Sequence, residues 1–291
     1  MNQSNRKFPW VNLVLFLVTL VSTVFWGALH WIGFYYPEIG KNELISLLKS
    51  GKIILMGLPF SFSIMLILLS HEMGHYLMAR KYGVDATLPY FIPAPNIVGT
   101  FGALIRIRGR IPSRKALFDV GAAGPITGFL VSIPFLFYGL VHSKLVEKIP
   151  QGGLSIGEPL IFKMFYKLFF PGIPSDRLLI HPVGFAAWVG LFITSLNLIP
   201  VGQLDGGHIS YAVFGKDSNK LSLAVLLFLF YLSISKWWVW LLWVAIILVI
   251  GVYHPEFQYE DRLDIKRYIL AVIILIIFLV TFIPQPFTFV P

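Results

Sequence analysis

The chain has 291 residues, of which 57% are hydrophobic and only 13% are charged, and its mean hydropathy is +0.78. Soluble domains are about 45–50% apolar and about 25% charged, so this composition excludes an ordinary soluble protein and indicates several membrane spans. The net charge of +9 comes without any polar segment of interleaved basic and aromatic residues, and Cys is absent, which excludes a nucleic-acid surface, disulfides and thiolate chemistry.

The first part of the chain predicts two spans followed by a segment of a different kind. A spanning helix needs about 20 mostly apolar residues, and residues 10–36 and 53–82 both meet that length. We expect the first to be a retained span rather than a signal peptide. Residues 86–111 contain three Pro and three Gly, and their GTFGALIRIRGR stretch alternates in the period of a strand. A short β-hairpin dipping into the membrane fits this segment, since irregular backbone is tolerated there when protein or water surrounds it.

The second part of the chain predicts further spans around one long polar connection. A third span, residues 117–141, contains Gly124 and Gly128, a spacing that allows close helix approach, although simple packing would explain it equally well. In the connection, residues 142–180, the LIFKMFYKLFF segment is too short to cross and is expected at the membrane interface. Later spans are expected at 182–204, twice within 221–253, and marginally at 268–283.

The predicted fold class is therefore an all-α polytopic membrane protein with about six to seven transmembrane helices and a short membrane-dipping β-hairpin. Residues 1–49 would form an N-terminal span and loop, residues 50–215 a membrane core, and residues 216–291 the C-terminal spans. No internal repeat or low-complexity segment is evident.

Lys and Arg divide unequally between the two ends of these spans. The richer set is Arg6, Lys7, Arg80, Lys81, Arg106, Arg108, Arg110, Arg114, Lys115, Lys216, Lys220, Arg262, Lys266 and Arg267. The poorer set holds Lys41, Lys49, Lys52, Lys236 and the mixed connection 142–180. Because basic residues accumulate on the cytoplasmic side, we expect the N-terminus and the richer set to be cytoplasmic, in a cytoplasmic membrane.

His71, Glu72 and His75 form an HExxH pattern inside the second span. On a helix the two histidines lie on one face, one turn apart, so they can bind a single zinc ion while the glutamate acts on a metal-bound water. Ionisable groups are costly at membrane depth and are functional candidates there by default.

A catalytic zinc site needs a third protein ligand and an open position. The candidate is Asp205, close to Pro200, Gly202 and a glycine pair that would break a helix near the end of the fourth span. A broken membrane helix can aim a carboxylate into a cavity, but a carboxylate that merely caps a surface loop would explain Asp205 about as well.

At these residues the chain resembles the site-2 protease family of intramembrane zinc metalloproteases, whose pattern is HExxH on one span and NxxPxxxLDG on a later one. Both motifs are complete, as His71, Glu72 and His75, then Asn197, Pro200, Leu204, Asp205 and Gly206. The resemblance covers roughly residues 50–215, including the hairpin beside the active site. It implies that Asp205 is the third ligand of one Zn²⁺ per chain. It does not extend to PDZ or CBS domains, for which the connecting segments are too short.

The resemblance implies an intramembrane zinc metalloendopeptidase that hydrolyses peptide bonds in or near transmembrane segments of membrane proteins. Glu72 would take a proton from the metal's water and return it to the leaving amine. Asn197 would bind the substrate backbone or the developing oxyanion, unless it only packs. The expected partners are a transmembrane protein substrate, which could pair with the strand-like 99–108 segment, and the lipid bilayer, with no nucleic acid. The active site would lie toward the cytoplasmic leaflet.

Three other functions fit parts of the pattern. A metal-binding membrane transporter should carry ionisable groups on several spans, but the spans outside the two motifs are nearly free of them. A prenyl-protein-type membrane protease also uses HExxH, usually with a later Glu ligand. A non-catalytic homologue should have lost catalytic positions, and all are filled. The remaining histidines are expected at span ends and in loops; for His208, a loop role is favoured over contact with the metal ligands.

Overall fold

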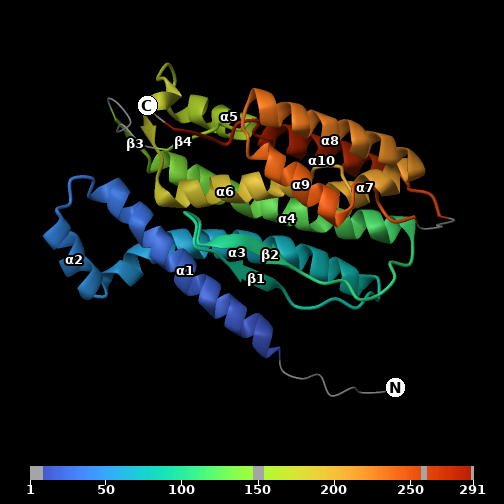
Figure 1. The fold of residues 1–291 in the computed structure, drawn as a ribbon, viewed down its shortest axis with the longest axis horizontal. Helices are drawn as coiled ribbons and strands as arrows, with labels where there is room; N and C mark the ends of the chain where they lie inside the picture. The colour runs from blue at the N-terminus through green and yellow to red at the C-terminus, as the bar shows by residue number, and fades with distance from the viewer. Residues whose placement is uncertain (1–8, 147–153, 257–260, 290–291) are drawn as a thin grey trace.

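The computed structural model describes residues 9–146, 154–256 and 261–289 of the chain. Its helices pack into one elongated bundle, in which α3, α4 and α6 run side by side and α1 crosses obliquely (Figure 1). The α-helices are α1 (Trp10–Tyr35), α2 (Lys41–Lys49), α3 (Lys52–Lys81), α4 (Arg114–Val141), α5 (Leu160–Phe169), α6 (Pro182–Asn197), α7 (Asp205–Phe214), α8 (Ser218–Ser235), α9 (Trp240–Ile250) and α10 (Ile265–Thr281). Two short 3-10 helices are η1 (Ser175–Arg177) and η2 (Gly215–Asp217).

Within the described residues, four stretches of helix are long and apolar enough to cross a membrane, namely α1, α3, α4 and the Asp205–Ser235 stretch that contains α7 and α8. Two shorter apolar helices, α6 and α9, accompany them. Large apolar side chains are exposed along α1, α8, α9 and α10, as expected where helices face lipid rather than water. The predicted helical, multi-pass membrane protein is confirmed at this level.

Side-chain caps fix where several helices begin. Ser113 accepts a hydrogen bond from the Ala116 N–H, 3.1 Å away, so α4 starts three residues before the expected Leu117. Asp264 caps α10 in the same way by accepting from the Arg267 N–H. The imidazole of His181 accepts from the N–H of Val183 at the start of α6. His181 is therefore a buried capping residue, although the sequence suggested an ordinary loop residue.

The strand period predicted within residues 99–108 is confirmed in part. Strand β2 (Thr100–Leu104) pairs antiparallel with β1 (Tyr90–Pro93), and an isolated bridge joins Ala86 to Ile107 further along. At the turn, Gly99 has φ +81° and lies so close to the backbone of α1 that a Cβ would be 2.8 Å from the Ser22 carbonyl oxygen. The β1–β2 pair therefore packs directly on α1. Four shorter strands, β3 (Lys144–Leu145), β4 (Leu154–Ile156), β5 (Leu178–Leu179) and β6 (Phe287–Phe289), form the pairs β3–β5 and β4–β6.

Three segments differ from or sharpen the sequence-based expectation. Residues 41–49 form helix α2, whereas a loop was expected after the first span in residues 1–49. The LIFKMFYKLFF segment forms α5, a helix of 10 residues, which agrees with the expectation that it is too short to cross a membrane. The fourth span was expected to continue to about Leu204, but α6 ends at Asn197. Pro200 and Gly202, which has φ +55°, lie in the irregular stretch that follows, because neither suits a continuing helix.

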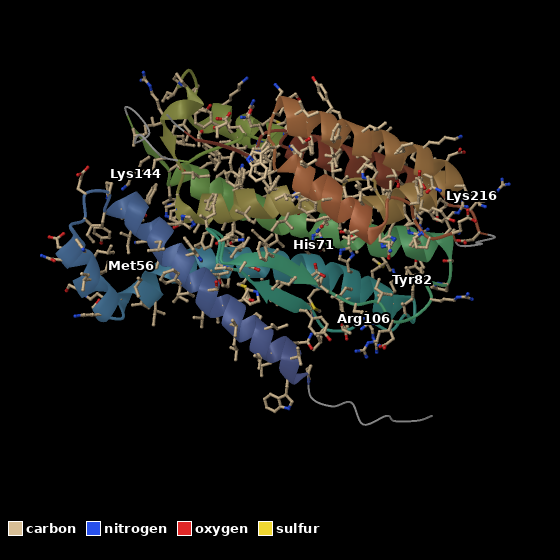
Figure 2. The ribbon with its side chains drawn as sticks, in the orientation of Figure 1. Met56, His71, Tyr82, Arg106, Lys144 and Lys216 are labelled. Atoms are coloured by element: carbon tan, nitrogen blue, oxygen red, sulfur yellow. The ribbon has the colours of Figure 1, made fainter. Side chains whose placement is uncertain are left out.

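Polar interactions gather at the end of the bundle where α3 finishes and α4 and α10 begin. Arg267 donates from Nε to Asp119 Oδ1 (2.8 Å) and from Nη2 to Asp119 Oδ2 (2.6 Å) and the Tyr82 hydroxyl (3.1 Å). It also forms an ion pair with Asp264. This cluster ties α3, α4 and α10 together. In Figure 2, Tyr82, Arg106 and Lys216 lie toward this end and Lys144 toward the other. Arg6 and Lys7 of the richer basic set are outside the described residues.

Candidate metal centre

Three possible metal ligands converge between α3 and α7. The Nε2 atoms of His71 and His75, one turn apart on α3, are 3.2 Å from each other. Asp205 Oδ2, on the first residue of α7, is 3.3 Å from His71 Nε2 and 3.2 Å from His75 Nε2. His71 precedes the end of α3 at Lys81 by ten residues, about 15 Å of helix. Figure 2 shows His71 near the middle of the bundle.

These distances fit a zinc ion. Ligand atoms bonded tetrahedrally at about 2.0–2.1 Å from zinc are about 3.3 Å from one another, and the three observed separations are 3.2, 3.2 and 3.3 Å. Two imidazole nitrogens and one carboxylate oxygen are also a donor set that zinc accepts. Within the described parts of the chain, this is the one group of three such side chains close enough to share an ion.

The orientation of each imidazole is set by α4. His75 Nδ1 donates to the Val120 carbonyl oxygen, 2.7 Å away, which leaves Nε2 as the free acceptor that a metal needs. A Cβ at Gly124 would be 2.5 Å from His75 Cε1, and one at Gly128 would be 2.9 Å from His71 Nδ1. The two glycines of the GxxxG pattern therefore make room for the two histidines. Their role is specific to this site, where the sequence had left general packing open.

Two glycines that follow Asp205 pack against neighbouring backbone and so set the direction of the Asp205 side chain. A Cβ at Gly206 would be 2.7 Å from the Ile199 carbonyl carbon, and one at Gly207 would be 2.7 Å from the Val201 carbonyl oxygen. Helix α7 thus begins by packing directly on the irregular 198–204 stretch, which only glycine permits. This arrangement points the Asp205 carboxylate at α3.

Glu72 and Asn197 lie in the same cavity as the three ligand residues. The cavity has a volume of about 240 Å³. Glu72 is buried, and its carboxylate interacts with the backbone N–H of Ile105, just after β2. The Asn197 amide nitrogen is 3.1 Å from His71 Nε2. The structure therefore brings together all five residues that the sequence singled out.

One histidine at this site was placed incorrectly by sequence reasoning, and a second has a contact that it did not predict. His208 was expected in a loop, but it belongs to α7 and lines the same cavity. His254 lies outside the helices, as expected, but it is buried, stacks on Tyr211 and lies 2.7 Å from His208. The spacing of three residues from Asp205 to His208, one turn of a helix, could have revealed the first. No local pattern signals the second, because its contact joins distant segments.

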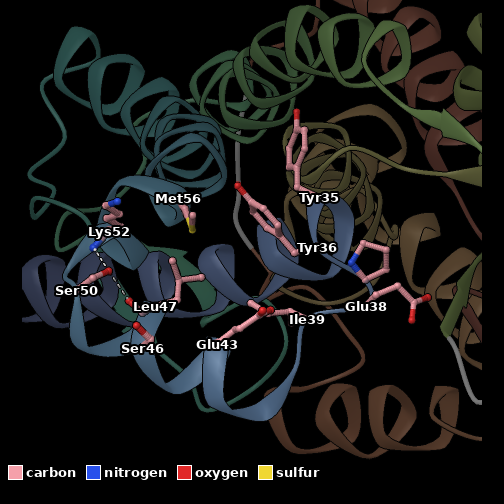
Figure 3. Close-up of a pocket in the computed structure, with 11 residues that line it drawn as sticks. Tyr35, Tyr36, Glu38, Ile39, Glu43, Ser46, Leu47, Ser50, Lys52 and Met56 are labelled. Carbon is pink, nitrogen blue, oxygen red and sulfur yellow. Dashed lines mark hydrogen bonds between the residues drawn. The ribbon is translucent and has the colours of Figure 1, made fainter.

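A larger cavity of about 700 Å³ lies elsewhere, between the end of α1, helix α2 and the start of α3 (Figure 3). Its lining includes Glu38, Glu43, Lys52 and Met56. These carboxylates are not joined by a histidine, and the cavity lies beside the first turns of α3, away from His71. The smaller cavity is therefore the candidate site.

Comparison with known proteins agrees with this geometry. The model of peptidase family M50 matches residues 59–235, which is more than half of the chain and includes both motifs. The probable zinc metalloprotease EGY1, chloroplastic, of Oryza sativa subsp. japonica is 34% identical over 228 residues, covering 72% of this chain and 38% of that protein. The probable zinc metalloprotease EGY2, chloroplastic, of Arabidopsis thaliana is 30% identical over 262 residues, covering 86% and 46%. This chain spans less than half the length of these two relatives. With the motifs and the family match together, the chain belongs to peptidase family M50, the site-2 protease family.

Proposed function

We propose that this protein is an intramembrane zinc metalloendopeptidase that hydrolyses peptide bonds in or near transmembrane segments of membrane proteins. The observation that carries the proposal is the convergence of His71, His75 and Asp205 at zinc-ligand separations, beside a buried glutamate and deep within an apolar helix bundle. The M50 family match and relatives named as zinc metalloproteases support it.

His71, His75 and Asp205 would hold one Zn²⁺, which supplies a Lewis acid that activates water and polarises a carbonyl. Glu72 is the general base, because it follows the first ligand directly and its carboxylate faces the same cavity. It accepts a proton from the attacking water and later delivers it to the leaving amine. The Val120 carbonyl keeps the His75 ring in its ligand tautomer.

Asn197 is assigned to the substrate rather than to the metal. Its amide nitrogen is 3.1 Å from His71 Nε2, the atom that would ligate zinc. An N–H donor so close to the ligand set can reach the carbonyl oxygen of the scissile bond and stabilise the negative charge that develops there.

The substrate would be bound as an extended strand. A peptide bond in a helix is shielded by its neighbours, so the segment to be cut must unwind first. Among the described residues, β2 pairs with β1 and with no other strand, so its second edge could accept an added strand. Residues 103–105, at the end of β2, line the cavity that contains Glu72. A peptide added to β2 would therefore pass the general base.

We propose six to seven spans, with the β1–β2 hairpin dipping into the membrane. The shorter apolar helices α6 and α9, together with α10, supply the spans beyond the four long ones. Residues 50–215 would form the catalytic core between the flanking segments 1–49 and 216–291. The end of the bundle where α3 finishes and α4 begins would face the cytoplasm, in a cytoplasmic membrane. The N-terminus and the access to the site would lie on that same side.

The test is co-expression with a tagged library of single-span membrane proteins. Wild type should cleave at least one member, and Glu72→Gln should retain zinc but cleave it about 10²–10⁴-fold more slowly, because Gln cannot accept the proton. His142→Leu is a matched control and should cleave normally. It alters an exposed histidine at the end of α4 whose ring interacts, among the described residues, with Tyr138 and with the His181 ring. Equal cleavage by wild type and Glu72→Gln would remove Glu72 from the mechanism, and zinc transport without cleavage would favour a transporter.

A further inference from the structure

A hydrogen-bonded histidine pair adjoins the metal centre and has no part in the mechanism above. His208 Nδ1 lies 2.7 Å from His254 Nε2, and His254 Nδ1 lies 2.8 Å from the Pro255 carbonyl oxygen. These hydrogen bonds hold one side of the His254 ring, and the ring of Tyr211 stacks on it with 4.3 Å between the ring centroids. The pair therefore has a fixed geometry rather than the freedom of a surface side chain.

The chain of hydrogen bonds determines where each proton lies. A carbonyl oxygen can only accept, so His254 Nδ1 carries a proton and donates it to Pro255. Burial lowers the pKa of His254, which keeps the ring neutral and its Nε2 without a proton. That Nε2 must then accept from His208 Nδ1. A neutral His208 consequently presents an unprotonated Nε2, which is a hydrogen-bond acceptor and not a donor.

The unprotonated nitrogen belongs to a side chain that lines the active-site cavity. His208 is partly exposed, although Gly207 and Ile209 on either side of it in α7 are buried. The cavity that it lines also contains Glu72 and the end of β2. No described residue forms a hydrogen bond with His208 Nε2. This acceptor nitrogen is therefore available to a hydrogen-bond donor on a molecule bound in the cavity.

We propose that His208 is a substrate-binding residue whose Nε2 accepts a hydrogen bond from one backbone N–H of the extended peptide in the cavity. The inference rests on the proposed protease function. The cavity is bounded by β2 on one side and by α7 with His208 on another. An extended peptide points successive N–H groups to opposite sides. A peptide paired with β2 along one edge therefore presents N–H groups along its other edge, which His208 can accept.

This contact predicts a sequence restriction on the substrate. Proline has no backbone N–H, and an N-methylated residue has none either. At one position of the substrate, and at no other, proline or an N-methylated residue should therefore weaken binding through loss of the hydrogen bond to His208. Side-chain identity at that position should matter less, since the hydrogen bond involves only backbone.

The experiment measures binding of a fluorescent synthetic peptide that spans the cleavage site of the library protein cleaved by wild type. Full-length Glu72→Gln protein in detergent binds the peptide without cutting it, and zinc content is checked in every variant. Adding His208→Leu should weaken binding about threefold to tenfold, the typical contribution of one neutral hydrogen bond. Adding His208→Gln, which keeps an acceptor, should restore most of the affinity. N-methylation of one amide should weaken binding to Glu72→Gln by a similar factor and should have no effect once His208→Leu is present.

Each contrary result overturns the proposal. If N-methylation weakened peptide binding equally with and without His208→Leu, no peptide amide would be coupled to His208. ¹⁵N NMR of the unmutated histidine pair should show His208 protonated on Nδ1, and a protonated Nε2 would refute the assignment without any variant. If His208→Leu does not fold, His254→Leu tests the same point, because loss of the tautomer lock should weaken the same amide-dependent binding. Failure of wild type to cleave any protein would overturn the proposed function as well, whereas cleavage with uncoupled N-methyl effects would overturn only the role of His208.

Discussion

Gly124→Ala should remove zinc from this protein without touching a ligand residue. The methyl carbon would be 2.5 Å from His75 Cε1 and still closer to Nε2, whereas ordinary contacts begin at 3.4 Å, so the ring or α4 must move by at least about 0.9 Å. Metal–ligand distances tolerate only about 0.2 Å, so His75 would leave the ligand set. Changes to residues that merely support a ligand typically cost 10–100-fold in metal affinity. Here we expect a loss of at least about 100-fold.

The assay is zinc affinity by chelator competition on purified protein in detergent, together with thermal stability. Gly139→Ala is the matched control. Gly139 lies on the same helix as Gly124 but far from the ligands, and its Cβ would overlap Gly184 of α6. It should cost stability by about 1–3 kcal/mol through overpacking while zinc affinity stays normal. Gly33→Ala, with nothing within 4 Å, should change neither property. Normal zinc affinity in Gly124→Ala, or an equal loss in folded Gly139→Ala, would refute the reasoning.

The other predictions concern metal content, stability and topology. Asp205→Ala should lose most of the roughly one zinc per chain, and full retention measured by metal analysis would remove Asp205 from the ligands. Arg267→Gln should lower the free energy of unfolding by about 3 kcal/mol, because Asp119 loses its charged partner; an unchanged melting temperature would contradict this. Burial, with smaller contributions from His142 and Lys144, lowers the pKa of His181 from 6.5 to about 4, so stability should fall as the pH drops through 6.5 toward 4. His181→Asn keeps the cap acceptor and should flatten that dependence in pH-dependent melting, while a slope equal to that of wild type would exclude His181 as its source. Because the chain has no native Cys, Pro112→Cys should be labelled only after permeabilisation and Pro171→Cys in intact cells; the reverse would invert the proposed orientation.

The sequence predicted which residues gather at the site better than it predicted the path of the backbone. HExxH predicts its own geometry because two histidines one turn apart share a helix face, and α3 places them that way. Asp205 required the family resemblance, since its approach to α3 depends on the 198–204 stretch and on the close packing of Gly206 and Gly207. Helix α2 was missed because a short polar stretch between two long apolar spans was interpreted as a loop, although Leu44, Ile45 and Leu47 recur at helical spacing.

Contacts between distant segments lay beyond local patterns. The pairing of His208 with His254 and the clustering of Asp119, Tyr82 and Arg267 join residues far apart in the chain. Each of these residues, taken alone, looks like an ordinary polar group near a span end. They find their partners only when α4 packs against α3, α7 and α10 and the segment after α9 reaches α7. The role of Gly124 and Gly128 was ambiguous for the same reason, because the sequence does not state which helix they face.

The division of the ligands between α3 and α7 has a consequence for biosynthesis. When the ribosome has made only the first spans, His71 and His75 are already in the membrane, but Asp205 has not yet been synthesised. Two imidazoles alone hold zinc weakly, so a nascent or truncated chain would be an inactive protease. Hydrolytic activity would arise only after α7 packs on α4 and brings Asp205 to the two histidines of α3. On the proposed function, capture of the metal would therefore mark assembly of the catalytic core, and neighbouring membrane proteins would not meet an active enzyme during insertion.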